Sequence, residues 1–99
     1  MKILLTANKT YRGFIDTTWW YFFMPLEEMG HNVCFYDTVH GADKSYSEII
    51  DSFKPDLIFC IMTGDANIAP KEPWTEILKE TNSGRTKTFN WFCDDTWRF

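Results

Sequence analysis

Six consecutive apolar residues at positions 57–62 constrain the fold of this chain more than any other feature. A continuous apolar run of this length is typical of a strand buried on both faces, as in a parallel sheet. Pro55 precedes the run and favours an extended conformation at Lys54, so the strand begins just after it. The small polar residues at 63–65 suit a turn and end the run. The sequence therefore predicts a central strand of an α/β sheet.

Three more strand patterns and three helix patterns alternate with this strand. The other strands are predicted over residues 2–7, 32–37 and 86–93, and the helices over residues 17–29, 46–53 and 73–81. Ser45 and Glu48 have the spacing of a capping box. Such alternation gives a parallel sheet with right-handed crossovers. The first and third strands are the most apolar, which places them in the middle and gives the order 2-1-3-4. We expect one α/β domain over residues 1–99, a three-layer Rossmann-like or flavodoxin-like open sheet of four parallel strands.

The first predicted helix is apolar on more than one side, which is typical of a helix buried on more than one side. Pro25 is expected to kink it. The chain also holds five Trp, four Tyr and nine Phe, more large aromatic residues than we expect so small a domain to bury. We therefore predict a homodimer or larger assembly, through this helix or the edge of the fourth strand. The alternative is a monomer in which a loop at residues 8–15 covers Trp20 and Met24.

Composition and charge exclude several classes of protein. The net charge is −4 with acids and bases scattered, so no basic stripe predicts nucleic-acid binding. No apolar run has the length of a membrane span, and the first residues run into a strand pattern instead of a signal peptide. Three cysteines, Cys34, Cys60 and Cys93, do not form a disulfide or zinc pattern, so we expect reduced core cysteines in a cytoplasmic protein.

Three polar loops follow the predicted strand ends, and adjacent parallel strands bring such loops to one rim of the sheet. Their cations, carboxylates and aromatic faces suit a polyhydroxylated ligand. The candidate substrate-binding residues are Asn8, Arg12, Gly13, Thr63, Gly64, Asp65, Asp94, Asp95, Trp97 and Arg98. The catalytic residues stay unknown, with Asp16, Asp94 and Asp95 as candidates. The alternative is that Asp94 and Asp95 only cap a following helix or turn.

Several sharper site patterns are missing. The first loop lacks the Gly-x-Gly-x-x-Gly of dinucleotide sites and the Gly-Lys-Ser/Thr of a phosphate-binding loop. Asp94 and Asp95 are adjacent in sequence, with neither a histidine nor a third acid nearby, so we expect no metal site. We therefore expect the protein to bind no cofactor.

Two segments together resemble a known family. One is Met1-Lys-Ile-Leu-Leu-Thr-Ala-Asn followed by Tyr11-Arg-Gly, and the other is Lys54-Pro-Asp-Leu-Ile-Phe followed by Asn90-Trp-Phe-Cys-Asp-Asp-Thr-Trp-Arg-Phe. They resemble the N-terminal half of glycosyltransferases with two facing Rossmann-like domains (the GT-B type), most closely the CgeB-like spore-maturation group. The resemblance covers essentially the whole chain. Its first segment is generic among such enzymes, and its last is more specific.

This resemblance implies a function for the domain. In that family the N-terminal domain holds a sugar or glycan acceptor, and the C-terminal domain holds the nucleotide-sugar donor. The chain ends where the donor domain would begin, so we expect an acceptor-side domain that is not active alone. The alternative is a stand-alone flavodoxin-like binding or assembly module without catalysis.

Overall fold

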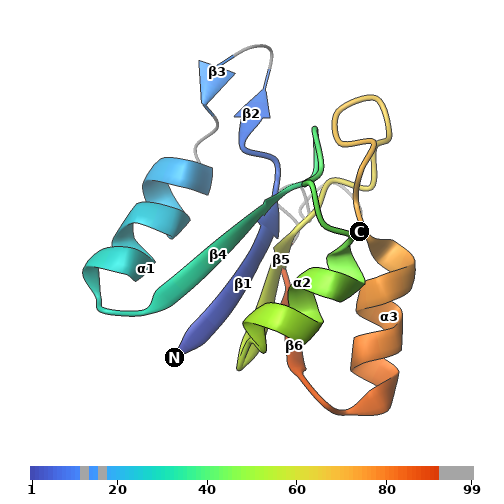
Figure 1. Ribbon diagram of the computed structural model, residues 1–99. Coiled ribbons are helices and arrows are strands. Elements are labelled where there is room, and N and C mark those ends of the chain that lie inside the picture. Colours follow the sequence, from blue (N-terminus) through green and yellow to red (C-terminus); the bar gives the residue numbers. More distant parts are fainter. Residues whose placement is uncertain (12–13, 16–17, 92–99) are drawn as a thin grey trace.

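The computed structural model describes residues 1–11, 14–15 and 18–91 (Figure 1). Its main sheet has four parallel strands in the order β4-β1-β5-β6. Their bounds are Asn32–Asp37 for β4, Lys2–Ala7 for β1, Leu57–Ile61 for β5 and Lys87–Asn90 for β6. The predicted four-stranded parallel α/β sheet is therefore confirmed. The first and third of these strands along the chain, β1 and β5, hold its two central positions.

Helices cover both faces of the sheet (Figure 1). On one face lie η1, a π-helical segment at Trp19–Phe23, and α1 at Met24–Glu28. On the other face lie α2 at Tyr46–Phe53 and α3 at Trp74–Ser83. The three-layer arrangement expected from the alternation of elements is thus present. No helix in the described part of the chain is long and apolar enough to cross a membrane.

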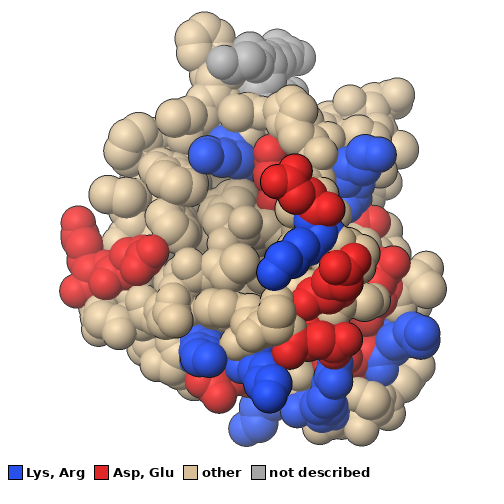
Figure 2. Space-filling model, in the orientation of Figure 1, with Lys and Arg blue, Asp and Glu red and all other residues tan. Residues whose placement is uncertain are grey.

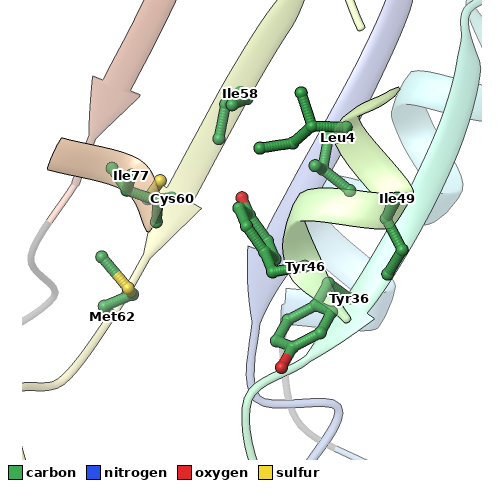
Figure 3. Packing of buried hydrophobic residues seen from close by; sticks show 9 residues of the cluster. Leu4, Tyr36, Tyr46, Ile49, Ile58, Cys60, Met62 and Ile77 are labelled. Atoms are coloured by element: carbon green, nitrogen blue, oxygen red, sulfur yellow. The ribbon is translucent and has the colours of Figure 1, made fainter. Parts of the chain in front are cut away.

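Alternating side chains along β5 divide the core into two clusters, one on each face of the sheet. Ile58 and Cys60 pack with Tyr46 of α2 and Ile77 of α3 (Figure 3). Ile61 belongs to the other cluster, which also contains Ile3, Leu5, Ala7 and Val33 and is bordered by Phe22 and Phe23 of η1. The central strand is therefore buried on both faces, as its apolar run predicts.

The start of α2 confirms the predicted capping box. The backbone N–H of Glu48 donates to Ser45 Oγ at 3.2 Å, and the N–H of Ser45 donates to Glu48 Oε1 at 3.4 Å. These two bonds satisfy N–H groups that a helix start leaves without intrahelical partners. The helix ends at Phe53, and Lys54 follows it in the left-handed region, with a φ of 53°, before Pro55.

The first helix differs from the continuous, kinked helix expected over residues 17–29. Its first part, η1, has wider π-helical turns, and the N–H of Met24 donates to the carbonyl of Trp19 five residues earlier. Pro25 then lies in the first turn of α1, where its missing N–H needs no intrahelical acceptor. The change of helix type at this point accommodates the proline.

Three other expectations need correction. Residues 8–15 are not simply a loop, because β2 at Thr10–Tyr11 and β3 at Phe14–Ile15 form a short antiparallel ribbon. The helical spacing of Trp74, Ile77, Leu78 and Thr81 predicts one apolar face on α3, but only Ile77 of these four is buried. Trp74 and Leu78 are exposed, at 38% and 59%, and Thr81 is exposed as well. Glu80 is buried on α3 instead. The last strand, β6, is shorter than the predicted 86–93, and residues 92–93 lie outside the described part.

Candidate functional site

The carboxyl ends of β4, β1 and β5 form one rim of the sheet, which is the candidate site. In the sheet register Ala7 of β1 pairs with Asp37 of β4 on one side and with Ile61 of β5 on the other. The residues after these positions therefore emerge at the same level. Asn8 follows β1 directly, and Thr63 follows β5 after one further residue. Two of the three predicted loops thus lie on neighbouring strand ends, as expected.

A short segment at residues 68–72, here named the rim strap, connects the ends of β4 and β5. The N–H of Lys71 donates to the carbonyl of Thr38, just past β4, at 2.8 Å. Tyr36 Oη donates to the carbonyl of Lys71 at 3.3 Å. At the other end, Glu72 accepts from the N–H of Thr63 at 2.7 Å. Because β1 lies between β4 and β5, the rim strap links the strand ends on the two sides of β1.

Asp37, the last residue of β4, is a hydrogen-bonded carboxylate at the rim. It accepts from the N–H of Val39 at 2.9 Å, from the N–H of Lys9 at 3.2 Å and from His40 Nδ1 at 3.0 Å. Partial burial raises the pKa of Asp37, but these hydrogen bonds outweigh it and leave the pKa below its ordinary 3.8. The carboxylate therefore stays ionised and holds His40 Nδ1 as a donor. The His40 side chain is itself 71% exposed.

Lys9 places a cationic group at this rim. Its Nζ lies 4.7 Å from the centre of the Trp19 ring, a cation–π distance. Trp19 also stacks on Phe23, with ring centroids 4.2 Å apart. The ammonium group is thus positioned by the first helix, while the backbone N–H of the same residue binds Asp37. Carboxylate, imidazole and ammonium groups therefore gather where β1 and β4 end.

The predicted site residues fall into two groups. Asn8 is nearly buried, with an exposed fraction of 7%, and its Nδ2 donates to the carbonyl of Thr10. Asp65 is exposed, and its Oδ1 accepts from the N–H of Asn67, so part of its capacity closes its own turn. Thr63 and Gly64 direct their N–H groups to Glu72. The remaining candidates lie outside the described residues: Arg12, Gly13, Asp16, Asp94, Asp95, Trp97 and Arg98.

The sequence interpretation missed Asp37, His40 and Glu72. In the sequence Asp37 is only the last residue of the strand predicted over residues 32–37, and His40 lies in the loop that follows. A signal existed in the carboxylate three residues before a histidine, just past an apolar strand. Glu72 had no such signal, because its partners lie eight and nine residues earlier along a loop.

Neither of the two cysteines in the described part of the chain is activated as a nucleophile. Cys34 and Cys60 are free thiols. Burial raises the pKa of Cys60 to about 12 and also raises the pKa of Cys34. Both therefore remain protonated near neutral pH, and neither is a ready nucleophile. Over residues 1–11, 14–15 and 18–91, no three His, Cys, Asp or Glu side chains are grouped so as to hold a metal ion.

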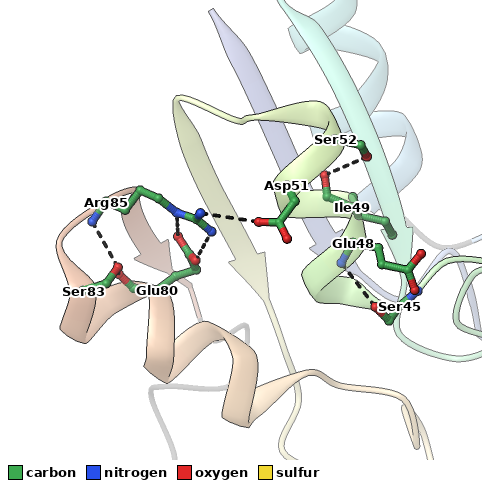
Figure 4. A network of polar contacts seen from close by, with 8 residues as sticks. All are labelled: Ser45, Glu48, Ile49, Asp51, Ser52, Glu80, Ser83 and Arg85. Atoms are coloured by element: carbon green, nitrogen blue, oxygen red, sulfur yellow. Dashed lines mark hydrogen bonds and ion pairs between the residues drawn. The ribbon is translucent and has the colours of Figure 1, made fainter.

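A second polar cleft, of about 410 Å³, lies between α2 and α3. Arg85 spans it, donating from Nε to Glu80 at 3.2 Å and pairing with Asp51 at 3.4 Å (Figure 4). The hydrogen bond from Arg85 lowers the pKa of Glu80, although burial opposes this. Arg85 thus pairs with Asp51 of α2 and Glu80 of α3 and ties the two helices together. Acids and bases are also interspersed over this part of the surface (Figure 2).

Comparison with known proteins gives no assignment. No protein-family model matches the chain, and neither the curated proteins nor the solved structures contain a match to it.

Proposed function

We propose that this chain is a carbohydrate-binding α/β domain, the acceptor-side half of a glycosyltransferase of the GT-B type, and that it does not transfer sugar alone. The sequence resemblance to CgeB-like proteins motivates the enzyme class. The observation that carries the binding site is the rim itself, where polar groups follow three neighbouring strand ends. In open α/β sheets, ligands bind outside the carboxyl ends of the strands.

The groups at this rim suit a polyhydroxylated ligand. Asp37 fixes the tautomer of His40, so the exposed ring can offer its other nitrogen to a hydroxyl group. Lys9 and Asp65 add a donor and an acceptor on the neighbouring strand ends. The sugar or glycan that accepts the transferred residue would therefore be held by side-chain hydrogen bonds. A second domain would bind the nucleotide-sugar donor. The free thiols of Cys34 and Cys60 are in keeping with a cytoplasmic location.

A nuclear magnetic resonance titration tests this proposal. Neutral hexoses, amino sugars, uronic acids and short oligosaccharides are added to ¹⁵N-labelled protein. Binding at the rim predicts saturable shifts at Lys9, His40 and Asp65, and unchanged signals at Lys79 in the cleft between α2 and α3. A panel that leaves all rim signals unchanged contradicts the proposal. Transfer or hydrolysis of any nucleotide sugar by this chain alone contradicts the proposal that the domain is inactive without a donor-binding domain.

A specific observation favours the second candidate, an assembly module without catalysis. Large apolar side chains are exposed on η1, on the outer strand β6 and just after it, namely Trp20 at 55%, Tyr21 at 72%, Phe89 at 52% and Trp91 at 49%. In the view of Figure 2 the surface over η1 is largely uncharged, whereas acidic side chains gather over α1. Such surfaces are typical of contacts between subunits, which supports a homo-oligomer.

A further inference from the structure

Two consecutive backbone N–H groups converge on one carboxylate just past the central strand β5. The N–H of Thr63 donates to Glu72 Oε2 at 2.7 Å, and the N–H of Gly64 donates to Glu72 Oε1 at 3.1 Å. Each carboxylate oxygen thus receives one amide. Gly64 has a φ of +73°, a left-handed conformation that glycine adopts without strain. Successive N–H groups directed to one side form an anion-binding concavity.

The occupant of this concavity comes from elsewhere in the chain. Glu72 lies eight and nine residues beyond the two amides and belongs to the rim strap. Trp74 Nε1 donates to the same carboxylate at 3.2 Å. The strap is fixed at its other side by the bond from Lys71 to Thr38. A tethered carboxylate therefore occupies the place where an open parallel sheet receives a ligand.

We propose that the Thr63–Gly64 amide pair is an oxyanion site and that Glu72 is its built-in occupant, displaced by a ligand carrying a carboxylate or phosphate group. Both kinds of group match two amides with two oxygens. This inference goes beyond sugar binding, because it requires only an oxyanion on the ligand. It also makes the strap a competitor, since ligand and Glu72 need the same two N–H groups.

Competition by the tethered Glu72 carboxylate lowers the affinity of the Thr63 and Gly64 amides for free anions in the wild-type protein. A carboxylate on a short tether acts at a local concentration in the millimolar range or above. Weak, free anions are therefore excluded while Glu72 is present, and they gain access when its carboxylate is removed. A group that merely caps the loop predicts no such gain.

The test compares Glu72→Ala with the wild type and with Glu28→Gln, which removes an exposed carboxylate on α1 and changes the net charge equally. Inorganic phosphate and acetate are titrated separately at constant ionic strength, and the amide signals of Thr63 and Gly64 are followed. Glu72→Ala is expected to show saturable shifts at both amides, with an affinity at least about tenfold above that of the wild type and of Glu28→Gln. The anion that binds Glu72→Ala more tightly, phosphate or acetate, identifies whether the natural ligand carries a phosphate or a carboxylate group.

A second variant keeps the inference testable if Glu72→Ala loses its fold. Glu72→Gln preserves the shape of the side chain and one accepting oxygen but removes the charge, and it is expected to show the same phosphate-dependent shifts with smaller gain. A folded Glu72→Ala or Glu72→Gln protein whose Thr63 and Gly64 amides ignore both anions overturns the inference. Equal shifts in wild type and variants overturn it as well, because Glu72 would then not compete.

Discussion

Thr6 of β1 and Tyr46 of α2 share a hydrogen bond, with their hydroxyl oxygens 2.7 Å apart and both side chains buried. The bond joins the central strand to the helix layer inside an otherwise apolar cluster, where Tyr46 also meets the edge of Tyr36 (Figure 3). Burial raises the pKa of Tyr46, so its hydroxyl group stays protonated. The pair fixes the position of α2 on the sheet, and with it one side of the core below the rim.

Tyr46→Phe is expected to destabilise the fold, because the buried hydroxyl of Thr6 then loses its hydrogen-bond partner. Leaving a buried polar group unsatisfied costs about 1–3 kcal/mol of unfolding free energy. The double variant Thr6→Val with Tyr46→Phe removes both groups and is expected to recover part of this loss. Urea unfolding of the wild type, Thr6→Val, Tyr46→Phe and the double variant measures the coupling free energy between the two hydroxyl groups. Additive effects of the two substitutions contradict the assigned bond.

Ser45→Ala is expected to weaken α2 by removing the acceptor of its capping box. The loss is about 1 kcal/mol of unfolding free energy, the usual cost of an N-cap substitution. Ser47→Ala is the matched control, because Ser47 is exposed on the same helix and lies outside the cap. Its effect is expected to stay within about 0.5 kcal/mol. Similar urea midpoints for both variants would show that the cap contributes nothing.

Asp37 predicts a pH dependence of stability. Its pKa is lowered in the folded state, so its ionised form contributes stability that is present above the ordinary value of 3.8 and is lost as the pH falls through the folded value. Asp37→Asn lacks this contribution. The unfolding free energies of wild type and variant are therefore expected to differ at pH 6 and to converge as the pH falls below about 4. A constant difference from pH 6 to pH 3 contradicts the hydrogen-bonded carboxylate.

Association through η1 and α1 predicts that a dimer or larger species sediments at micromolar concentration. The alternative monomer required Trp20 and Met24 to be covered, yet both are exposed, at 55% and 37%. Replacing the two with Gln is expected to dissociate the assembly if this helix is the contact, and to change little if the edge of β6 is. A single monomeric species of the wild type would refute association altogether.

The main elements of the fold were predictable because their signals are local or periodic. The run at 57–62 indicates a two-faced strand, and Ser45 with Glu48 marks a helix start within four residues. The ribbon of β2 and β3 was not predictable, because strands of two residues carry no usable period. The buried face of α3 was misjudged at Glu80, since its partner Arg85 lies beyond the end of the helix.

The rim was predictable only as a place. Adjacent parallel strands bring Asn8 and Thr63 to one edge whatever their side chains do. What the groups bind there depends on tertiary contacts, such as the bond from the Lys9 N–H of one strand end to Asp37 of the next. The occupation of the Thr63 and Gly64 amides by Glu72 likewise depends on the path of the strap. No spacing rule in the sequence encodes either arrangement.

Carbohydrate binding at the carboxyl rim is tested most directly by one pair of histidine variants. His40 lies just past the carboxyl end of β4, and His31 lies just before its amino end, so His40→Ala and His31→Ala remove the same side chain at opposite edges of the sheet. The saccharide with the largest shifts in the wild-type titration is bound to each variant. Rim binding predicts about tenfold weaker affinity for His40→Ala, the equivalent of one hydrogen bond, and unchanged affinity for His31→Ala. Equal affinity of both variants, or a loss confined to His31→Ala, contradicts a site at the carboxyl rim.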